Sequence, residues 1–405
     1  MYKWLPRGTR GRCEKDVRHV FVKTIHKAGI KTFCLLVLIA LGGAALLTWP
    51  QAVATGASRG LSICSGVLIP SLFPFLVLAG FLVRSGVSRA LGRRLERFTR
   101  KVFGLPGCCA AGILVGFIGG YPAGGVAVGQ LVEQGDITPR QGRRMLRFCV
   151  NAGPAFVISA VGAGMLGSAR YGAVLFFAHI AASLLLGVGQ RIWIGKQKRR
   201  PLAAEPPRPR AAHKPLPASA ALVESVNAAC RSLLYMCGFV VLFASLLSLA
   251  DVSGVAGFFQ YLLTLPISLA GSDPAEVPDL FAGLLEVSCG CIEAASSGAA
   301  APFLLGFIMG WGGLSVHCQL AASLYEYRLL DKTFFLFRLL HGVLAGSLSL
   351  LLFRFVPLPL EVFNPLQDAV VMPYATSAAA SVALLLMCAM LLLTGRGRQK
   401  EIGGK

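Results

Sequence analysis

Apolar residues in this chain gather into runs of roughly twenty, and short polar stretches separate the runs. An α-helix of that length crosses the apolar core of a bilayer, so the runs predict membrane-spanning helices. We place full spans at 32–50, 61–84, 145–168, 170–191, 222–250, 301–325, 334–355 and 372–395. Two shorter segments, 87–104 and 254–270, predict helices at the membrane interface. The first is basic and amphipathic, as expected of a helix on the inner face.

Two further apolar segments, about 107–133 and 278–300, predict re-entrant hairpins, because each has a Gly-rich or polar centre. Backbone freed from helical hydrogen bonds at membrane depth is tolerated only where protein covers it or where it lines a cavity. Transporters bind their substrates at interruptions of this kind. The predicted fold class is therefore all-α: a polytopic membrane protein with about eight transmembrane helices and two re-entrant hairpins.

The chain has 39 Lys and Arg against 18 Asp and Glu, a formal net charge of +21. The basic residues occupy short loops between the apolar runs and form no basic face of a soluble domain. Their charge therefore indicates topology and excludes nucleic acid as a partner. It predicts a multi-pass protein of the cell membrane whose N- and C-termini are cytoplasmic. The stretches 251–279 and 356–371 contain no Lys or Arg, and we place both outside.

The predicted order of elements contains an inverted repeat. A span, an interfacial helix, a hairpin and two more spans occur twice, and the two units start from opposite sides of the membrane. His179 and His341 have the same separation in sequence as Asn151 and Gly313, which supports the register. The predicted organisation is a basic cytoplasmic segment 1–31, a first span 32–57, repeat unit 58–191, a basic Pro-rich cytoplasmic linker 192–219, repeat unit 220–355, and a last span with a basic tail 356–405.

Glycine and proline concentrate at the centre of the first hairpin, in Gly119, Gly120, Tyr121 and Pro122. We expect this segment to be the hairpin tip and to bind substrate, with backbone N–H groups and a helix N-terminus facing an anion. The alternative is that the glycines only allow neighbouring helices to pack closely.

Span three contains a second candidate binding segment, with Asn151, Gly153 and Pro154. Asn151 can donate and accept hydrogen bonds at the midplane, and Pro154 leaves a carbonyl one turn back without its helical donor. The alternative is a proline kink in which the asparagine is already satisfied.

Two acidic residues, Glu286 and Glu293, mark the predicted tip of the second hairpin. A carboxylate at membrane depth is a functional candidate, and this pair could carry H⁺ or hold Na⁺ as the coupling ion. The alternative is a shallow hairpin in which both acids meet water.

Span six is predicted to break at Gly312 and Gly313. Ser315 and Gln319 follow on one helix face and are candidates for binding substrate. His317 points elsewhere and is a third candidate for ion coupling. The alternative is that this histidine bonds to a neighbouring helix.

The sequence predicts neither an enzyme nor a resident metal or cofactor. The twelve cysteines are scattered, and neither Cys108–Cys109 nor Cys289–Cys291 has a second pair at zinc spacing. No Ser/His/Asp arrangement stands out in the loops. No Lys or Arg is expected within the core, so the charge that binds an anion would come from helix ends and polar side chains.

Four motifs together resemble a known family: Gly120–Pro122, Asn151–Pro154, Leu285–Val287 and Gly312–His317. Over residues 58–350 the chain resembles the YlbJ (SpoVV) type of sporulation integral membrane protein, within the nucleoside-recognition gate group. That family is similar in core plan to concentrative nucleoside transporters. The resemblance implies export of dipicolinic acid from the mother cell toward the forespore.

Three classes of function remain open at this point. The first is a transporter of a small organic anion, and the second is a transporter of nucleosides or related small molecules. The third is a non-transporting membrane scaffold of spore assembly. The expected partners are the small-molecule substrate, the lipid bilayer, H⁺ or Na⁺ as coupling ion, and a second copy of the chain in a homo-oligomer.

Overall fold

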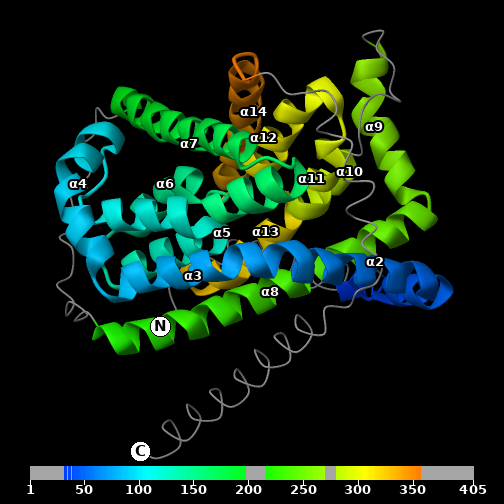
Figure 1. Cartoon of the computed structure of the whole chain (residues 1–405), viewed down its shortest axis with the longest axis horizontal. Helices are drawn as coiled ribbons and strands as arrows, with labels where there is room; N and C mark the ends of the chain where they lie inside the picture. Colours follow the sequence, from blue (N-terminus) through cyan, green and yellow to red (C-terminus); the bar gives the residue numbers. More distant parts are fainter. Residues whose placement is uncertain (1–31, 34, 38, 198–215, 270–279, 357–405) are drawn as a thin grey trace, which may run out of the picture. The chain divides into compact units, whose positions relative to one another are not determined.

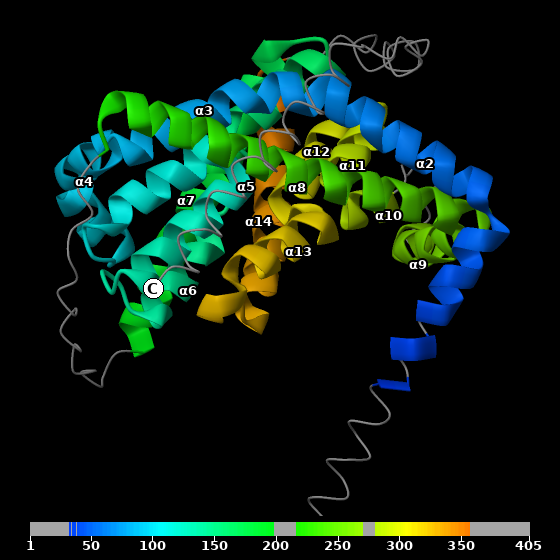
Figure 2. The ribbon, with the colours of Figure 1, turned by 90° about the horizontal axis from the view of Figure 1, so that it is seen from below.

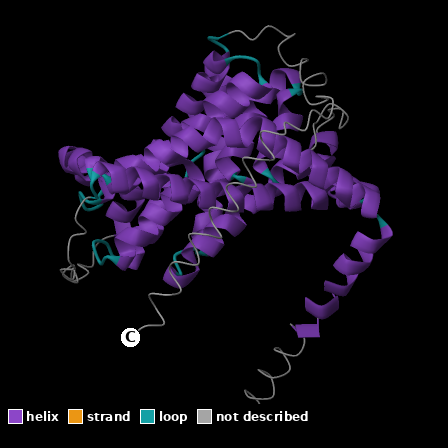
Figure 3. Cartoon of the chain, turned by 60° about the horizontal axis from the view of Figure 1, so that its bottom comes forward, coloured by secondary structure: helices purple, strands orange, loops and turns teal. Residues whose placement is uncertain are grey.

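The computed structural model describes residues 32–197, 216–269 and 280–356, apart from residues 34 and 38. These residues form helices and loops, with no strand among them, which confirms the predicted all-α class (Figure 3). The predicted N-terminal segment, most of the linker and the last span 372–395 lie outside the described residues.

Most helices follow the predicted apolar runs (Figure 1), but α2, Pro50–Ile63, occupies the stretch predicted to separate spans 32–50 and 61–84. Two of the segments, 64–68 and 155–165, are π-helical, a conformation often found at functional sites. The α-helices are α2 Pro50–Ile63, α3 Ile69–Arg84, α4 Val87–Phe103, α5 Cys109–Glu133, α6 Pro139–Cys149, α7 Ala169–Gln197, α8 Ala218–Val252, α9 Val255–Leu269, α10 Leu280–Leu285, α11 Val287–Ala295, α12 Ala301–Trp311, α13 Gly313–Leu324 and α14 Lys332–Phe353.

Within the described ranges, five helical segments are long and apolar enough to cross a membrane. They correspond to α5, α7, α8, α12 with α13, and α14. A sixth is possible by composition if residues 35–48 and 50–68, which meet at a bend of 91°, form one span. Uninterrupted helices α7, α8 and α14 thus confirm the predicted spans 170–191, 222–250 and 334–355, and the protein is a polytopic membrane protein. The predicted number of eight stays untested.

The chain divides into two compact units, residues 1–54 and 55–405. In the described part of the first unit, residues 39–48 are helical and α2 begins at Pro50. The second unit contains all the segments that the sequence analysis identified as candidate sites.

Glycines bring helices of the second unit into backbone contact. A Cβ added at Gly60 in α2 would lie 2.8 Å from Cα of Val241 in α8. One added at Gly310 in α12 would lie 2.4 Å from Cα of Gly342 in α14. Figures 1 and 2 show α3 beside α8 and α12 beside α14. Small residues are the usual means of helix association in membranes, where no hydrophobic force drives it.

Helix α5 is in fact a helical hairpin. Its backbone is non-helical at Gly120, where φ is 82° and ψ is −173°. A Cβ on Gly124 would lie 3.0 Å from Cα of Gly116, whereas residues eight apart in a straight helix are separated by about 12 Å. The two arms therefore run back along each other, and α5 is not a single span despite its length. This confirms a hairpin with its tip at the predicted segment.

Helices α10 and α11 form the second hairpin, which is shorter than the predicted range of 278–300. Glu286 between them is extended, with φ of −139° and ψ of 126°. A Cβ on Gly290 would lie 2.2 Å from Cα of Gly283, so these arms also touch. The observed tip is Glu286, the first residue of the segment 286–293 in which the tip was predicted.

Predicted spans three and six are both broken helices. The chain between α6 and the π-helix 155–165 leaves the helical conformation over residues 150–153. Gly312, at φ of 90°, and Gly313, at φ of 71°, separate α12 from α13. Both proposed repeats thus contain a hairpin followed by a broken helix. The inverted orientation of the repeats in a membrane stays a prediction.

Candidate functional site

The tip of the first hairpin lies against the break in span three. A Cβ on Gly120 would be 3.4 Å from the backbone nitrogen of Gly153, and one on Gly153 would be 3.1 Å from that of Gly120. Glycine is required at Gly120 also because its φ is in the left-handed region. Two stretches of backbone that lack helical hydrogen bonds therefore meet here.

The tip of the second hairpin lies against the break in span six. A Cβ on Gly313 would be 3.0 Å from the backbone nitrogen of Val287 and 3.2 Å from Cα of Glu286. The Glu286 side chain is 1% exposed and caps α11 by accepting a hydrogen bond of 2.7 Å from the Cys289 N–H. A carboxylate at this helix N-terminus is favoured by the positive end of the helix dipole.

One pocket connects both tips and both broken helices. Tyr121 and Gly153 reach it from the first repeat, and Glu286 and Gln319 reach it from the second. The rest of its wall is largely apolar and comes mainly from α3, the π-helix and α8. Its volume is about 50 Å³, whereas an apolar cavity of roughly 150 Å³ holds one benzene ring. The pocket must therefore widen before an aromatic solute can enter.

The structure places only part of the predicted site on the pocket wall. The predicted residues that line it are Gly119, Gly120, Tyr121, Pro122, Gly153, Glu286 and Gln319. The apolar wall includes residues that sequence reasoning did not single out, such as Leu72 and Val240. On a membrane-spanning helix, an apolar residue in a pocket wall and an apolar residue facing lipid look the same in the local sequence.

Asn151 is buried outside the pocket wall. Its Nδ2 donates to the Phe148 carbonyl at 2.9 Å and to Ser183 Oγ at 3.2 Å, whereas its buried Oδ1 has no partner among the described residues, so the alternative of a satisfied asparagine holds only for the donor end. Pro154 also lies outside the pocket wall and marks the start of the π-helix. Both residues maintain the break, and neither faces the pocket.

The break in span six holds three more predicted residues away from the pocket wall. Gly312 and Gly313 provide the left-handed turn, and Ser315 is fully buried beside them. The ring of His317 packs against Trp311, with centroids 4.4 Å apart, and against two phenylalanines of α14. Its nitrogens have no hydrogen-bond partner among the described residues, so the alternative of a histidine bonded to a neighbouring helix is not observed.

Glu293 lies at the far end of α11 from the tip, which differs from the predicted tip location. It forms an ion pair with Arg59 of α2 at 2.6 Å, and its side chain is 37% exposed. The expectation of two acids at the tip was wrong because α11 is helical, and seven residues of helix span about 10 Å.

Arg338 of α14 contradicts the expectation that the core contains no Lys or Arg. It is 1% exposed and donates to the carbonyls of Val150 and Gly310, one at each helix break. Its guanidinium carbon is 5.8 Å from the centroid of the Tyr121 ring. Tyr121 in turn donates to the Met309 carbonyl. Arg338 is only the fifth residue of the predicted span 334–355, where an arginine in the sequence resembles part of the inner loop.

The two histidines that supported the repeat register touch each other. His179 of α7 and His341 of α14 have ring centroids 4.4 Å apart, and Nε2 of His341 lies 3.0 Å from the His179 carbonyl. His179 also accepts a hydrogen bond from the N–H of Ala152 in the first break.

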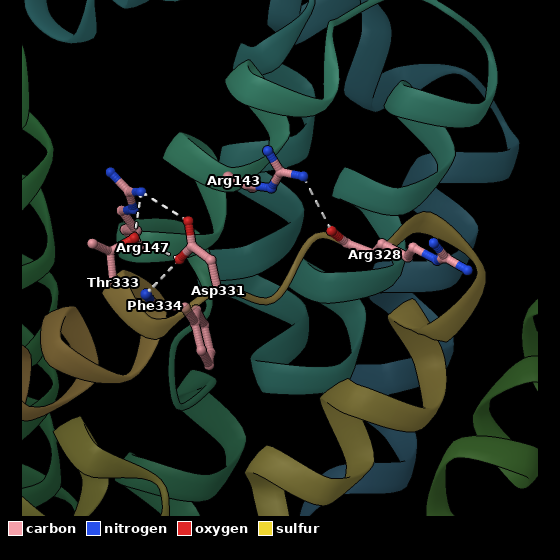
Figure 4. Close-up of polar contacts among 6 residues, drawn as sticks. All are labelled: Arg143, Arg147, Arg328, Asp331, Thr333 and Phe334. Atoms are coloured by element: carbon pink, nitrogen blue, oxygen red, sulfur yellow. Dashed lines mark hydrogen bonds and ion pairs between the residues drawn. The ribbon is translucent and has the colours of Figure 1, made fainter. Parts of the chain in front are cut away.

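A polar cluster joins α6 to the start of α14 (Figure 4). Arg147 donates to Asp331 Oδ2 at 3.1 Å and to Thr333 Oγ1 at 2.6 Å, and Asp331 caps α14 through the Phe334 N–H. Partial burial by itself raises the pKa of Asp331. Hydrogen bonds from Thr333 and Phe334 and the charge of Arg147 lower the pKa by more than burial raises it, so the pKa of Asp331 lies below the ordinary value. Arg143 also donates to the Arg328 carbonyl, at 3.4 Å.

The described part of the chain contains no group of three His, Cys, Asp or Glu side chains arranged to hold a metal ion. The chemistry of the pocket is that of backbone groups, one carboxylate, one phenol, one amide and the Ser288 hydroxyl among apolar side chains. Such a surface can bind and release a small solute.

Sequence comparisons agree with the motifs. Residues 66–169, which contain the first hairpin and the first break, match the family model Gate, described as nucleoside recognition. The chain is also similar to the sporulation integral membrane protein YlbJ of Bacillus subtilis (strain 168), with 29% identity over 333 residues, 77% of this chain and 80% of the relative. No solved structure matches it. The chain is thus an all-helical membrane protein that resembles the YlbJ type of sporulation integral membrane protein and contains a segment similar to the Gate family.

Proposed function

We propose that this protein transports a small organic anion across the membrane, with dipicolinic acid as the favoured substrate. The observation that carries the proposal is the pocket at which two hairpin tips and two broken helices converge. Discontinuous helices at a repeat interface are the usual substrate site of secondary transporters. The similarity to a sporulation protein favours dipicolinate among small aromatic anions.

Helix N-termini favour a negative solute in this pocket. The second arm of α5 begins at Tyr121, the π-helix begins at Ala155 and α11 begins at Val287, and all three residues line the pocket. N–H groups in a first turn have no acceptor within the regular helix and can bind carboxylate oxygens. In the closed state the Cys289 N–H is bonded to Glu286, and those of Phe156 and Val157 to the Gly153 carbonyl, so the solute would meet the positive helix ends as a whole. Backbone donors of this kind give reversible binding, which transport requires.

Glu286 supports coupling to a cation. Its carboxylate lies in the same pocket as the proposed anion, so the two charges repel each other unless H⁺ or Na⁺ binds with the substrate. A coupled cation would remove that repulsion, and the substrate gradient and the cation gradient would then be linked. Glu293 is unsuited to this role because it pairs with Arg59 at an exposed position.

The small volume of the pocket indicates a closed state between two open ones. We propose that the hairpin tips separate from the breaks to admit the solute, first on one side of the membrane and then on the other. This mechanism uses the inverted repeats 58–191 and 220–355 and places both termini in the cytoplasm. It requires no second copy of the chain, although a homo-oligomer is compatible with it.

A nucleoside transporter is the second candidate, and the match of residues 66–169 to the nucleoside-recognition family model favours it. Gln319 could pair with a base edge as well as with a carboxylate. A non-transporting scaffold is the third, and it predicts that substitutions in the pocket leave the function intact.

Flux into proteoliposomes containing the purified protein tests the proposal. We expect uptake of labelled dipicolinate that excess dipicolinate blocks and excess uridine does not. The variant Gln319→Leu removes a pocket hydrogen-bonding group and should lower uptake about tenfold. Ala322→Leu on the exposed side of α13 is the matched control and should transport normally. Uridine uptake without dipicolinate uptake would establish the second candidate, and no uptake of either would favour the scaffold.

A further inference from the structure

Arg338 connects the two broken helices through their carboxyl ends. Val150 is the residue that ends α6, and Gly310 is in the last turn of α12. The Arg338 guanidinium donates to the carbonyl oxygens of both. The two acceptors are far apart in the chain, and one side chain from α14 satisfies both. Its planar fork of N–H donors suits this geometry, which an ammonium group reproduces poorly.

The two carbonyls that Arg338 binds carry the negative ends of helix dipoles. In a broken helix the negative end of the first half faces the positive end of the second half across the break. An anion near such a break is attracted by the N–H groups and repelled by the carbonyls. Arg338 neutralises the negative carbonyl end at both breaks. The electrostatic potential that a solute experiences in the pocket is then set mainly by the positive N-terminal ends.

The positive charge of Arg338 lies close behind the pocket wall. Its guanidinium carbon is 5.8 Å from the Tyr121 ring centroid, and Tyr121 lines the pocket. Among the described residues no carboxylate forms an ion pair with Arg338, since the ion pairs found there involve Arg59, Arg100 and Arg147. A buried charge in low dielectric acts over a longer range than a charge in water.

We infer that Arg338 determines the preference for an anionic over a neutral solute, without touching the solute itself. It is a positioning residue. It holds the two breaks in place, and its positive charge cancels the negative helix ends that would otherwise repel an anion. The inference rests on the proposed anion transport and adds to it the residue that selects for charge.

The test compares two solutes of the same shape and different charge. Dipicolinate is a dianion at neutral pH, and pyridine-2,6-dicarboxamide is its uncharged counterpart. Uptake of each is measured in proteoliposomes containing wild type, Arg338→Gln, Arg338→Lys or Arg354→Gln. Arg354 follows α14, is exposed and serves as the matched control. Protein content in the vesicles is equalised for every variant.

Wild type should favour the dianion, and Arg338→Gln should lower the ratio of dianion to diamide uptake about tenfold. Arg338→Lys should keep the ratio at a lower rate for both solutes, because it retains the charge and loses the fork. Arg354→Gln should match wild type. A structural role alone would lower both uptakes equally and leave the ratio unchanged.

The outcomes separate this inference from the proposed function. A wild type that favours the dianion, with a ratio that Arg338→Gln preserves, overturns the role of Arg338 alone. A wild type with no preference for the dianion, or with no uptake of either solute, overturns anion transport and this inference together. If Arg338→Gln does not accumulate, Arg338→Lys decides: loss of the ratio in that variant overturns the inference.

Discussion

Glu286 brings a carboxylate to the pocket wall and holds it there by capping α11. Its position at the hairpin tip distinguishes it from Glu293, which faces Arg59 at an exposed site. Two residues of the same chemical type, seven positions apart in the sequence, therefore have different environments. The difference allows a direct comparison of their functions.

Glu286→Gln should reduce dipicolinate flux by about tenfold or more, because the amide cannot carry a proton or hold a cation in the pocket. Glu293→Gln should change flux little, since an exposed ion pair contributes about 0–1 kcal/mol. Flux into vesicles is measured with and without a pH or Na⁺ gradient. Undiminished flux in both variants would remove the carboxylates from the mechanism. A loss that does not depend on a cation gradient would indicate a passive facilitator.

Gly120 adopts a conformation that other residues avoid, and its backbone touches Gly153. Gly120→Ala should destabilise the protein by about 1–3 kcal/mol and reduce transport, because the tip must shift away from the break. Gly238→Ala is the control: nothing lies within 4 Å of its added Cβ. Thermal unfolding in detergent and flux are compared for both. Equal unfolding temperatures and normal flux for Gly120→Ala would show that the tip tolerates movement.

At the scale of elements, the polar cluster of Figure 4 links α6 to the start of α14. Asp331 begins α14 and also receives the Arg147 side chain of α6. Because α14 carries Arg338, the orientation of α14 at its first turn affects how the arginine reaches both breaks. The cluster therefore stabilises the elements around the pocket from outside it.

Asp331→Ala should lower the free energy of unfolding at neutral pH by about 1 kcal/mol, the usual effect of losing a helix N-cap. The pKa of Asp331 is depressed, so its contribution is present above an unfolded pKa of about 3.9 and is lost as the pH falls through the folded value. Thermal unfolding of wild type and Asp331→Ala should therefore differ at pH 7 and converge only below the folded pKa of Asp331, which is lower than about 3.9. A difference that persists unchanged in acid would contradict a role for the ionised carboxylate.

At the scale of the whole molecule, the topology determines which side each hairpin opens to. We expect Asp136→Cys, after the first hairpin, to be cytoplasmic, and Ser253→Cys, at the end of α8, to be external. Both positions are exposed. In a background without the twelve native cysteines, a membrane-impermeant maleimide applied to intact cells should label only Ser253→Cys. Labelling of Asp136→Cys from outside would contradict the inverted repeat.

Much of the architecture was predictable because it depends on local chemistry. A glycine followed by Tyr121 and Pro122 in an apolar run cannot continue a helix, and the structure has its hairpin tip there. Gly312 and Gly313 likewise end α12 in the left-handed region. The candidate site was predictable only in part, since Asn151 and Ser315 were chosen for their polarity and lie outside the pocket wall.

The sequence by itself determined the membrane class, the places of the helices and the positions at which they break, because apolar run length and the backbone limits of Gly and Pro act over a few residues. Only the tertiary structure decided which breaks and tips meet, that Glu293 pairs with Arg59, and that Arg338 binds the carbonyls of Val150 and Gly310. These contacts join residues from separate helices. Their partners are selected by how closely the glycine-lined helices pack, a property of the folded molecule that local sequence does not encode.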